Sequence, residues 1–214
     1  MAELEFSVIN IAAEAYAAAP QLTARLRISE SSGTAIHAMA LRCQVKVQAQ
    51  RRGYTPEEET GLLELFGGRE RWPNTLKPLL WMQSGTMVQG FTGTTDVDLP
   101  LPCSFDFEVS AAKYLNALRD GTVPLEFLFS GTVFLRGGAA GFGVEQIPWD
   151  RETRYAMPVA VWRALMDAFF PNQGWIRLDR DVLAALARYK AVHGLISWEA
   201  AIEGLLAGAG EPVP

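Results

Sequence analysis

Histidine and cysteine are scarce in this sequence. The chain has two of each, His37, His193, Cys43 and Cys103, and no CxxC or HxxxH spacing brings any of them together. Protein metal sites are usually built from closely spaced ligand pairs. We therefore predict no metal site and no cofactor. His37 fits the start of a strand, and His193 fits a helix end, where it can face the helix dipole.

Positive charge is also in short supply. The chain has 19 Lys and Arg against 24 Asp and Glu, which gives a net charge of −5 and a pI near 5.2. Proteins that bind DNA or RNA depend on basic surfaces that release counterions from the phosphate backbone. This balance excludes nucleic acid as an expected partner.

Long apolar runs are missing as well. The longest stretch without charge, 78–95, is broken by glutamine, serine, glycine and threonine, whereas a membrane-spanning helix needs about 20 mostly apolar residues. The first 20 residues carry Glu3, Glu5 and Glu14 and no basic residue, unlike a secretory signal. We expect no membrane span, a cytoplasmic location and free thiols.

Catalytic motifs are absent too. No GxSxG string occurs, and Ser130 in FSGTVF lies within a predicted strand, without the sharp turn that exposes a nucleophile. Asp96 and Asp98 fall on the solvent side of another predicted strand, where nothing would shift a carboxylate towards acid–base work. We therefore expect the protein not to be an enzyme.

Alternation of apolar and polar residues predicts strands in the first two thirds of the chain. The clearest run is 97–109, and a second covers 39–47. Pro100 and Pro102 remove backbone donors, which places at least that part of the strand at a sheet edge or in an irregular segment. About seven strands are expected, near 4–9, 22–28, 39–47, 82–91, 97–109, 125–129 and 142–147. One wet face on each strand favours an antiparallel sandwich over a parallel sheet.

Helical signals interrupt the strands and then replace them. Thr55, Pro56 and Glu58 form a capping box with proline at the first helical position. After Pro158 the apolar spacing changes to that of helices, with further helices expected around 161–169, 183–190 and, capped by Ser197, 202–206. The fold class expected is α+β: a β-sandwich body over 1–150 and a helical C-terminal unit over 151–214 packed on it.

Tryptophan and arginine lie together in three loop-like segments. We nominate six of these residues for partner binding, because Trp and Arg are favoured anchors of protein interfaces. An equally good reading is that each indole fills the seam between the sheets and the helices, with arginine stacked over it. The six residues are Arg69, Arg71, Trp72, Trp149, Arg151 and Trp175.

Several long strings resemble an uncharacterised bacterial domain-of-unknown-function family, and together they cover nearly the whole chain. They include LRCQVKVQ, LFGGRERWPNTLKPLLW, GFTGTTDVDLPLPCSFDFEV and VEQIPWDRETRYAMPVAVWRALMDAFFP. Members of that family are often encoded beside uptake nickel–iron hydrogenase genes and their maturation factors. The resemblance therefore implies a hydrogenase context. The few cysteines and histidines argue that this chain holds neither an iron–sulfur cluster nor nickel itself.

The sequence thus leads to two hypotheses. The first is a non-catalytic accessory or interaction protein that supports hydrogenase assembly or maturation, with a hydrogenase subunit or maturation factor as its protein partner. The alternative is a small-ligand-binding module with a pocket between the β body and the helical unit.

Overall fold

The computed structural model describes residues 2–14, 16–103, 110–136, 141, 143–171 and 176–211. The chain forms two compact units, Met1–Gly174 and Trp175–Pro214. Every strand that the structure describes belongs to the first unit, and the described part of the second unit contains two helices.

The smaller sheet of the first unit has three antiparallel strands in the order β1 (Leu4–Ala13), β2 (Gln21–Glu30) and β5 (Thr94–Pro102). In β2, buried aliphatic residues alternate with polar ones, as a strand with one wet face requires. Strand β5 lies at the edge of the sheet. Of the two positions predicted from Pro100 and Pro102, a sheet edge or an irregular segment, the structure shows the edge, where prolines interrupt no central ladder.

The larger sheet has the order β4 (Leu79–Phe91), β3 (Ile36–Val47), β6 (Thr122–Leu135) and β7 (Gly143–Gln146), with β8 (Glu152–Pro158) also on β6. All its pairs are antiparallel. Strand β8 pairs with the first half of β6 and β7 with the second half, while β3 takes the other edge. The chain between β7 and β8 therefore runs alongside the middle of β6 on the same edge.

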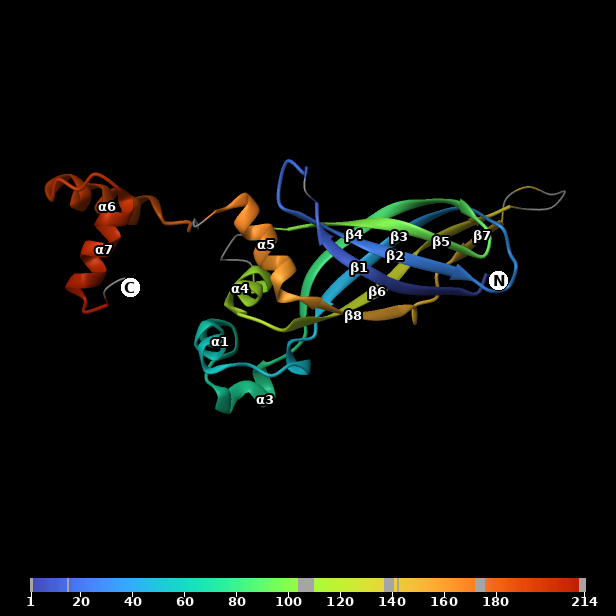
Figure 1. The fold of residues 1–214 in the computed structure, drawn as a ribbon, viewed down its shortest axis with the longest axis horizontal. Helices are drawn as coiled ribbons and strands as arrows, with labels where there is room; N and C mark the ends of the chain where they lie inside the picture. The colour runs from blue at the N-terminus through green and yellow to red at the C-terminus, as the bar shows by residue number, and fades with distance from the viewer. Residues whose placement is uncertain are drawn as a thin grey trace. The chain divides into compact units, whose positions relative to one another are not determined.

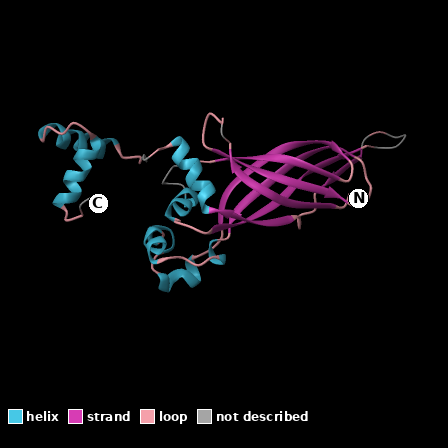
Figure 2. Ribbon diagram, in the orientation of Figure 1, coloured by secondary structure: helices cyan, strands magenta, loops and turns pink. Residues whose placement is uncertain are grey.

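The core lies between the two sheets. Phe6 of β1 stacks on Phe129 of β6 with 4.4 Å between ring centroids, which joins the two layers. The inward residues of β2 and β3 are buried, and such burial contributes about 25 cal/mol per Å² of apolar surface. Figure 2 shows the strands side by side, with the helices of this unit beyond one end of them.

Several helices of the first unit gather at that end (Figure 1). Trp162 anchors the last of them: it is buried, its Nε1 donates to Asn116 Oδ1 at 2.8 Å, and its ring meets Trp81 edge-on. The helices are η1 (Ala49–Arg51), α1 (Pro56–Gly61), α2 (Leu63–Phe66), η2 (Arg69–Arg71), α3 (Trp72–Thr75), α4 (Ser110–Ala117) and α5 (Val159–Phe169).

The second unit is a helical hairpin of α6 (Arg180–Val192) and α7 (Trp198–Gly208). Gly194, at a φ of 65°, ends the first helix in the left-handed conformation that glycine tolerates best. The Ser197 side chain accepts from the Ala200 N–H and caps the second helix, as predicted. None of the helices that the structure describes is long and apolar enough to cross a membrane.

The α+β class with antiparallel sheets and a helical C-terminal region is confirmed. The units, however, divide at residue 174, whereas the sequence pattern placed the division at 150. Strand β8 and helix α5 belong with the sheets, because β8 completes the ladder of β6 and Trp162 is buried in the same core. The predicted continuation of the strand after Cys103 falls on 104–109, outside the described residues.

Candidate functional site

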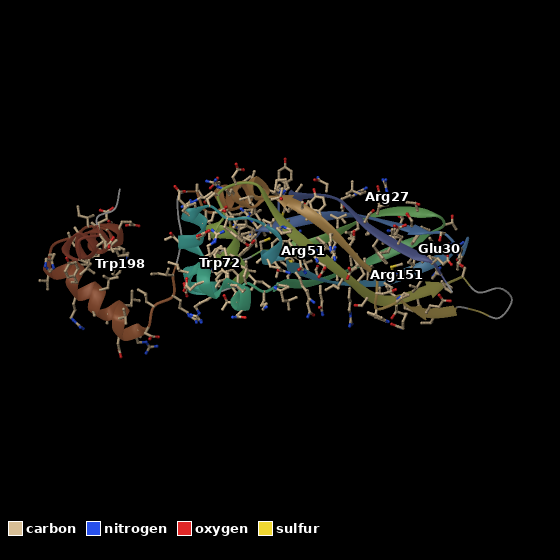
Figure 3. The ribbon with its side chains drawn as sticks, turned by 90° about the horizontal axis from the view of Figure 1, so that it is seen from below. Arg27, Glu30, Arg51, Trp72, Arg151 and Trp198 are labelled. Carbon is tan, nitrogen blue, oxygen red and sulfur yellow. The ribbon has the colours of Figure 1, made fainter. Side chains whose placement is uncertain are left out.

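The structure separates the predicted partner-binding residues instead of collecting them on one surface. Arg69, Arg71 and Trp72 lie in the helical segment between β3 and β4, while Trp149 and Arg151 lie between β7 and β8. Figure 3 shows Trp72 and Arg151 well apart along the first unit. Trp175 lies outside the described residues.

Trp72 is half-buried and held by its neighbours. Gly67, at a φ of 71°, ends α2 and lets the chain turn back, so that the Trp72 Nε1 donates to the Gly67 carbonyl at 3.1 Å. The indole also meets the Tyr54 ring edge-on, with 5.2 Å between centroids. Trp72 therefore combines the two readings of the sequence, because one part packs on the core and another faces solvent.

A hollow of about 550 Å³ opens beside the Trp72 indole. The Arg69 guanidinium lies over that indole at 5.9 Å and forms an ion pair with Glu59. Lys77 and Gln50 line the same hollow, together with Pro73, Leu76 and Pro78. This mixture of cationic, amide and apolar groups suits a ligand that has both a carboxylate and an apolar part.

Arg71 is exposed, and its aliphatic stem lies against Gly67. A side chain on Gly67 would meet the Arg71 Cδ at 3.0 Å, so the glycine makes room for the arginine. Arg71 is thus exposed beside Gly67 and is not part of the lining of the Trp72 hollow.

Trp149 is the most exposed tryptophan that the structure describes, at 91%. It sits in a turn closed by a bond from the Arg151 N–H to the Pro148 carbonyl at 3.3 Å. The Ile147 N–H donates to Gly131 and the Arg151 carbonyl accepts from Phe129, so β6 holds the turn on both sides. Trp149 projects from a fixed backbone instead of a loose loop.

Arg151 differs from Trp149 although they share this turn. Its side chain is partly covered, and its Nε has no hydrogen-bond partner among the described residues. The Nη1 atom lies 3.9 Å from Asp150 Oδ1, at the limit of an ion pair. The Arg151 Nε is therefore a buried donor without a partner, while the side chain as a whole is 37% exposed in the same turn as the Trp149 indole.

Sequence reasoning missed a buried ionic cluster at the helical end. Glu58 is 1% exposed, and its carboxylate accepts from Arg52 Nη2 at 2.8 and 3.0 Å. It also accepts from the Thr55 N–H at 3.1 Å and the Arg119 N–H at 2.8 Å. The capping-box motif identified the Thr55 bond, but the Arg119 bond spans 61 residues and leaves no local signal.

The Glu58 cluster is built to hold a charge, not to transfer a proton. Burial by itself raises the pKa of Glu58, but the N–H donors of Arg119 and Thr55, together with Arg52, outweigh it and lower the pKa below its ordinary value. Both oxygens have donors, so the carboxylate joins the helical segment to the chain before β6. We assign the cluster a structural role.

A second hollow, of about 490 Å³, lies on the outer face of the larger sheet. The register puts Arg42 between Gly85 on β4 and Ser130 on β6, and all three residues line the hollow. Ser130 is on a straight ladder opposite Arg42, as its sequence setting predicted. This face is polar and open.

The two cysteines are free and lie in apolar surroundings. Burial raises the pKa of both Cys43 and Cys103 to about 12, which makes them weak nucleophiles and weak metal ligands. Cys43 packs in the core, whereas Cys103 is half-buried. Within the described part of the chain, no group of three or more His, Cys, Asp or Glu side chains is arranged to hold a metal ion.

A family model covers the whole chain, residues 1–214, and its description is "Family of unknown function (DUF6084)". The chain belongs to this family. The family assignment agrees with the resemblance seen in the long sequence strings. No curated protein matches the sequence.

Solved structures show only distant similarity. An Arabidopsis thaliana protein known from its solution structure has 8% identity and a TM-score of 0.36, over 82% of this chain and 84% of its own. A beta-glucosidase from Kluyveromyces marxianus has 8% identity and a TM-score of 0.25, over 73% of this chain and 15% of the enzyme. Beta-glucosidase 3B from Thermotoga neapolitana has 11% identity and a TM-score of 0.24, over 72% and 17%. None of these similarities bears on the activity of this chain.

Proposed function

We propose that this DUF6084 protein is a non-catalytic accessory protein that binds a protein partner through the Trp149 turn. The observation that carries the proposal is the 91% exposure of an indole on an anchored backbone. Tryptophan is largely buried on average in folded proteins, so an indole left outside is informative. Its exposed apolar surface has no function in the folding of the sandwich.

The anchoring of the turn makes Trp149 a suitable binding residue. Hot spots of protein interfaces are enriched in Trp and Arg, and a pre-positioned side chain loses little conformational entropy on binding. The Arg151 side chain is 37% exposed in the same turn, although its unpartnered Nε is buried. A partner that covers the indole and offers an acceptor to the exposed part of the Arg151 guanidinium would match both groups.

The partner we propose is a hydrogenase subunit or maturation factor, and the compartment is the cytoplasm. Support for the partner comes from the resemblance to a family encoded beside uptake nickel–iron hydrogenase genes. The free thiols of Cys43 and Cys103 suit a reducing compartment. In this proposal the protein assists assembly by binding, and the partner carries the metal chemistry.

Affinity capture with the full chain as bait, from cells that make the hydrogenase, tests the proposal. We expect hydrogenase subunits or maturation factors in the capture, and we expect Trp149→Ala to lower their yield by about 10-fold or more, as loss of a hot-spot indole does. The melting temperature should stay unchanged. Tyr16→Ala is the matched control, because Tyr16 is an equally exposed aromatic residue, at 96%, in another loop.

Two results would count against this function. Capture that is equal for the wild type, Trp149→Ala and Tyr16→Ala would place the partner surface elsewhere. A melting temperature that falls together with capture in Trp149→Ala would make the indole a folding residue. Trp72→Ala, Arg69→Ala and Arg71→Ala extend the test to the hollow, and Trp72→Ala alone among these should also lower stability, since its ring packs on Tyr54.

A second candidate function is small-ligand binding in the hollow beside Trp72. Its volume of about 550 Å³ lies within the range of ligand pockets, and Arg69 and Lys77 supply cationic groups. Native mass spectrometry of protein purified from cells would detect a bound metabolite. Loss of that metabolite in Arg69→Ala, together with unchanged capture of proteins, would favour this candidate over the first.

A further inference from the structure

The helices of the C-terminal hairpin have almost no core of their own. Of its described residues, Ala201 alone is a buried hydrophobic. A unit of this size usually needs a disulfide, a metal or association with another surface to be stable. The described part of the hairpin contains no cysteine and no metal-binding cluster. Association is therefore the remaining source of stability.

The contact between α6 and α7 explains why large apolar side chains remain outside. The two helices meet through small residues, with Ala201 buried and Gly204 facing the Tyr189 hydroxyl, which a Cβ on the glycine would meet at 3.2 Å. Beside the turn that joins the two helices, the Lys190 Nζ lies 5.6 Å from the centre of the Trp198 ring. Small residues thus form much of the contact between α6 and α7, and larger apolar side chains of the two helices remain exposed.

The larger residues form a continuous stripe on α7. Trp198, Ile202 and Leu205 follow one another at spacings of four and three, which places them on one helix face. Their exposed fractions are 44%, 40% and 45%, and Figure 3 marks Trp198 on this helix. On α6, Val182 and Leu183 are exposed as well. Both helices therefore offer apolar surface to a partner.

The charges of the two helices are opposite. Helix α6 carries Arg180, Arg188 and Lys190 against Asp181, whereas α7 carries Glu199 and Glu203 and no basic residue. A partner of one charge sign would be attracted to one helix and repelled by the other. A second copy of the same hairpin has both signs in the complementary arrangement. An anionic membrane surface would be repelled by α7.

We propose that the hairpin is a self-association surface whose partner is the hairpin of a second copy of this chain. The two hairpins form a four-helix bundle with two-fold symmetry, in which α6 of each copy lies against α7 of the other. The stripe of Trp198, Ile202 and Leu205 is buried in the bundle. This proposal rests on residues 176–211 and is independent of the Trp149 turn.

Sedimentation and light scattering of the full-length chain over a range of concentrations test the proposal. We expect a dimer for the wild type. Leu205→Glu should raise the dimer dissociation constant by about 100-fold or more, because two-fold symmetry places the added charge in the interface twice. Ala207→Glu is the matched control: it adds the same charge two residues away on the opposite face of α7 and should leave the dimer intact.

Charge reversal gives a second test that does not depend on an apolar substitution. Reversing α7 with Glu199→Lys and Glu203→Lys makes both helices basic and should weaken the dimer by about 10-fold. Adding Arg180→Glu and Arg188→Glu to the same chain restores opposite signs and should restore the dimer. Hydrogen exchange of α6 and α7 checks that each variant still forms the hairpin.

Three outcomes would overturn the proposal. The first is a wild-type chain that is monomeric at every concentration, including one that binds anionic lipid vesicles instead. The second is a dimer that Leu205→Glu and Ala207→Glu affect equally while both retain their helices. The third is a dimer that the fourfold charge reversal fails to restore. Failure of the Trp149 proposal would leave all of these measurements unchanged.

Discussion

In the sandwich unit most apolar residues of the strands and of helix α5 are buried in one shared core, whereas in the C-terminal hairpin the apolar stripe of α7 is exposed. The exposed face of the small sheet carries ion pairs, such as Arg25 with Asp98 and Arg27 with Asp96. The exposed face of α7 carries Trp198, Ile202 and Leu205. The sandwich unit, which buries a large apolar core, thus presents charged groups on this face, whereas the hairpin presents apolar ones.

This contrast shows what amphipathic helices do and do not establish. Both α5 and α7 have apolar residues at helical spacing, yet α5 buries Trp162 and Leu165 while α7 buries a single alanine. Periodicity determines which residues share a face, and the number of neighbouring elements determines whether that face is covered. Measurements of stability and accessibility in the two units test this difference.

The largest effect on stability is expected from Trp162, at the end of the sandwich where the helices of the first unit gather. Trp162→Ala should lower the free energy of unfolding by about 3–5 kcal/mol, because it leaves a cavity and removes the indole N–H that donates to Asn116 Oδ1. Denaturant titration of the full-length chain measures it. Trp198→Ala is the counterpart in the hairpin and should change the sandwich transition by less than about 0.5 kcal/mol. Equal losses would mean that the two units unfold as one.

The buried ion pair should come next. Glu58→Ala leaves the Arg52 charge buried without its partner and should cost about 3 kcal/mol, while Glu57→Ala, on the exposed side of the same helix, should be nearly neutral. Because the folded pKa of Glu58 is lowered, its contribution is fully present above its unfolded pKa of about 4.3 and is lost as pH falls through the folded value. An acid titration that is the same for the wild type and Glu58→Gln would contradict this.

Thiol labelling compares accessibility in the two units directly. Cys43, with a pKa raised to about 12, should react with an alkylating reagent at neutral pH at least about 100-fold more slowly than a cysteine introduced on the hairpin by Ala207→Cys. The rates are followed by intact mass. Similar rates would show that the sandwich opens often enough to expose Cys43 to the reagent as readily as the cysteine on the hairpin surface.

The smallest effect is expected on the outer face of the small sheet. Arg27→Ala removes an exposed cross-strand pair with Asp96 and should lower stability by less than about 1 kcal/mol, with little dependence on the hairpin. Added salt should reduce the difference between the wild type and the variant further. A larger loss would show that this face is part of a more extensive network.

Much of the fold followed from local patterns. The period-two runs gave β2 and β3 close to their observed bounds and the second half of β5, and the Thr55 capping box gave the start of α1. Strand β8 was missed because its inward positions include Thr153 and Tyr155, which make the alternation weak. Its place is set by pairing with β6 and by the burial of Met157, and both of these depend on residues far away in sequence.

The candidate site was foreseen only in part. Composition identified the Trp–Arg segments, but it could not separate Trp149, which is exposed, from Trp72, which is half-buried against Tyr54. The difference arises because β6 holds the Trp149 turn on its edge, while the helical segment folds Trp72 inward. Glu58 was assigned a capping role, and its partners Arg52 and Arg119 became visible only in three dimensions.

The sequence by itself determined the class of the protein: α+β, acidic, with few metal ligands and with apolar residues spaced for strands first and helices later. These properties depend on composition and on neighbours within a few residues. The tertiary structure decided which apolar faces are covered, which tryptophan is exposed and where the units divide. Those outcomes depend on contacts between segments far apart in the chain, such as the ladder that joins β8 to β6 and leaves Trp149 outside.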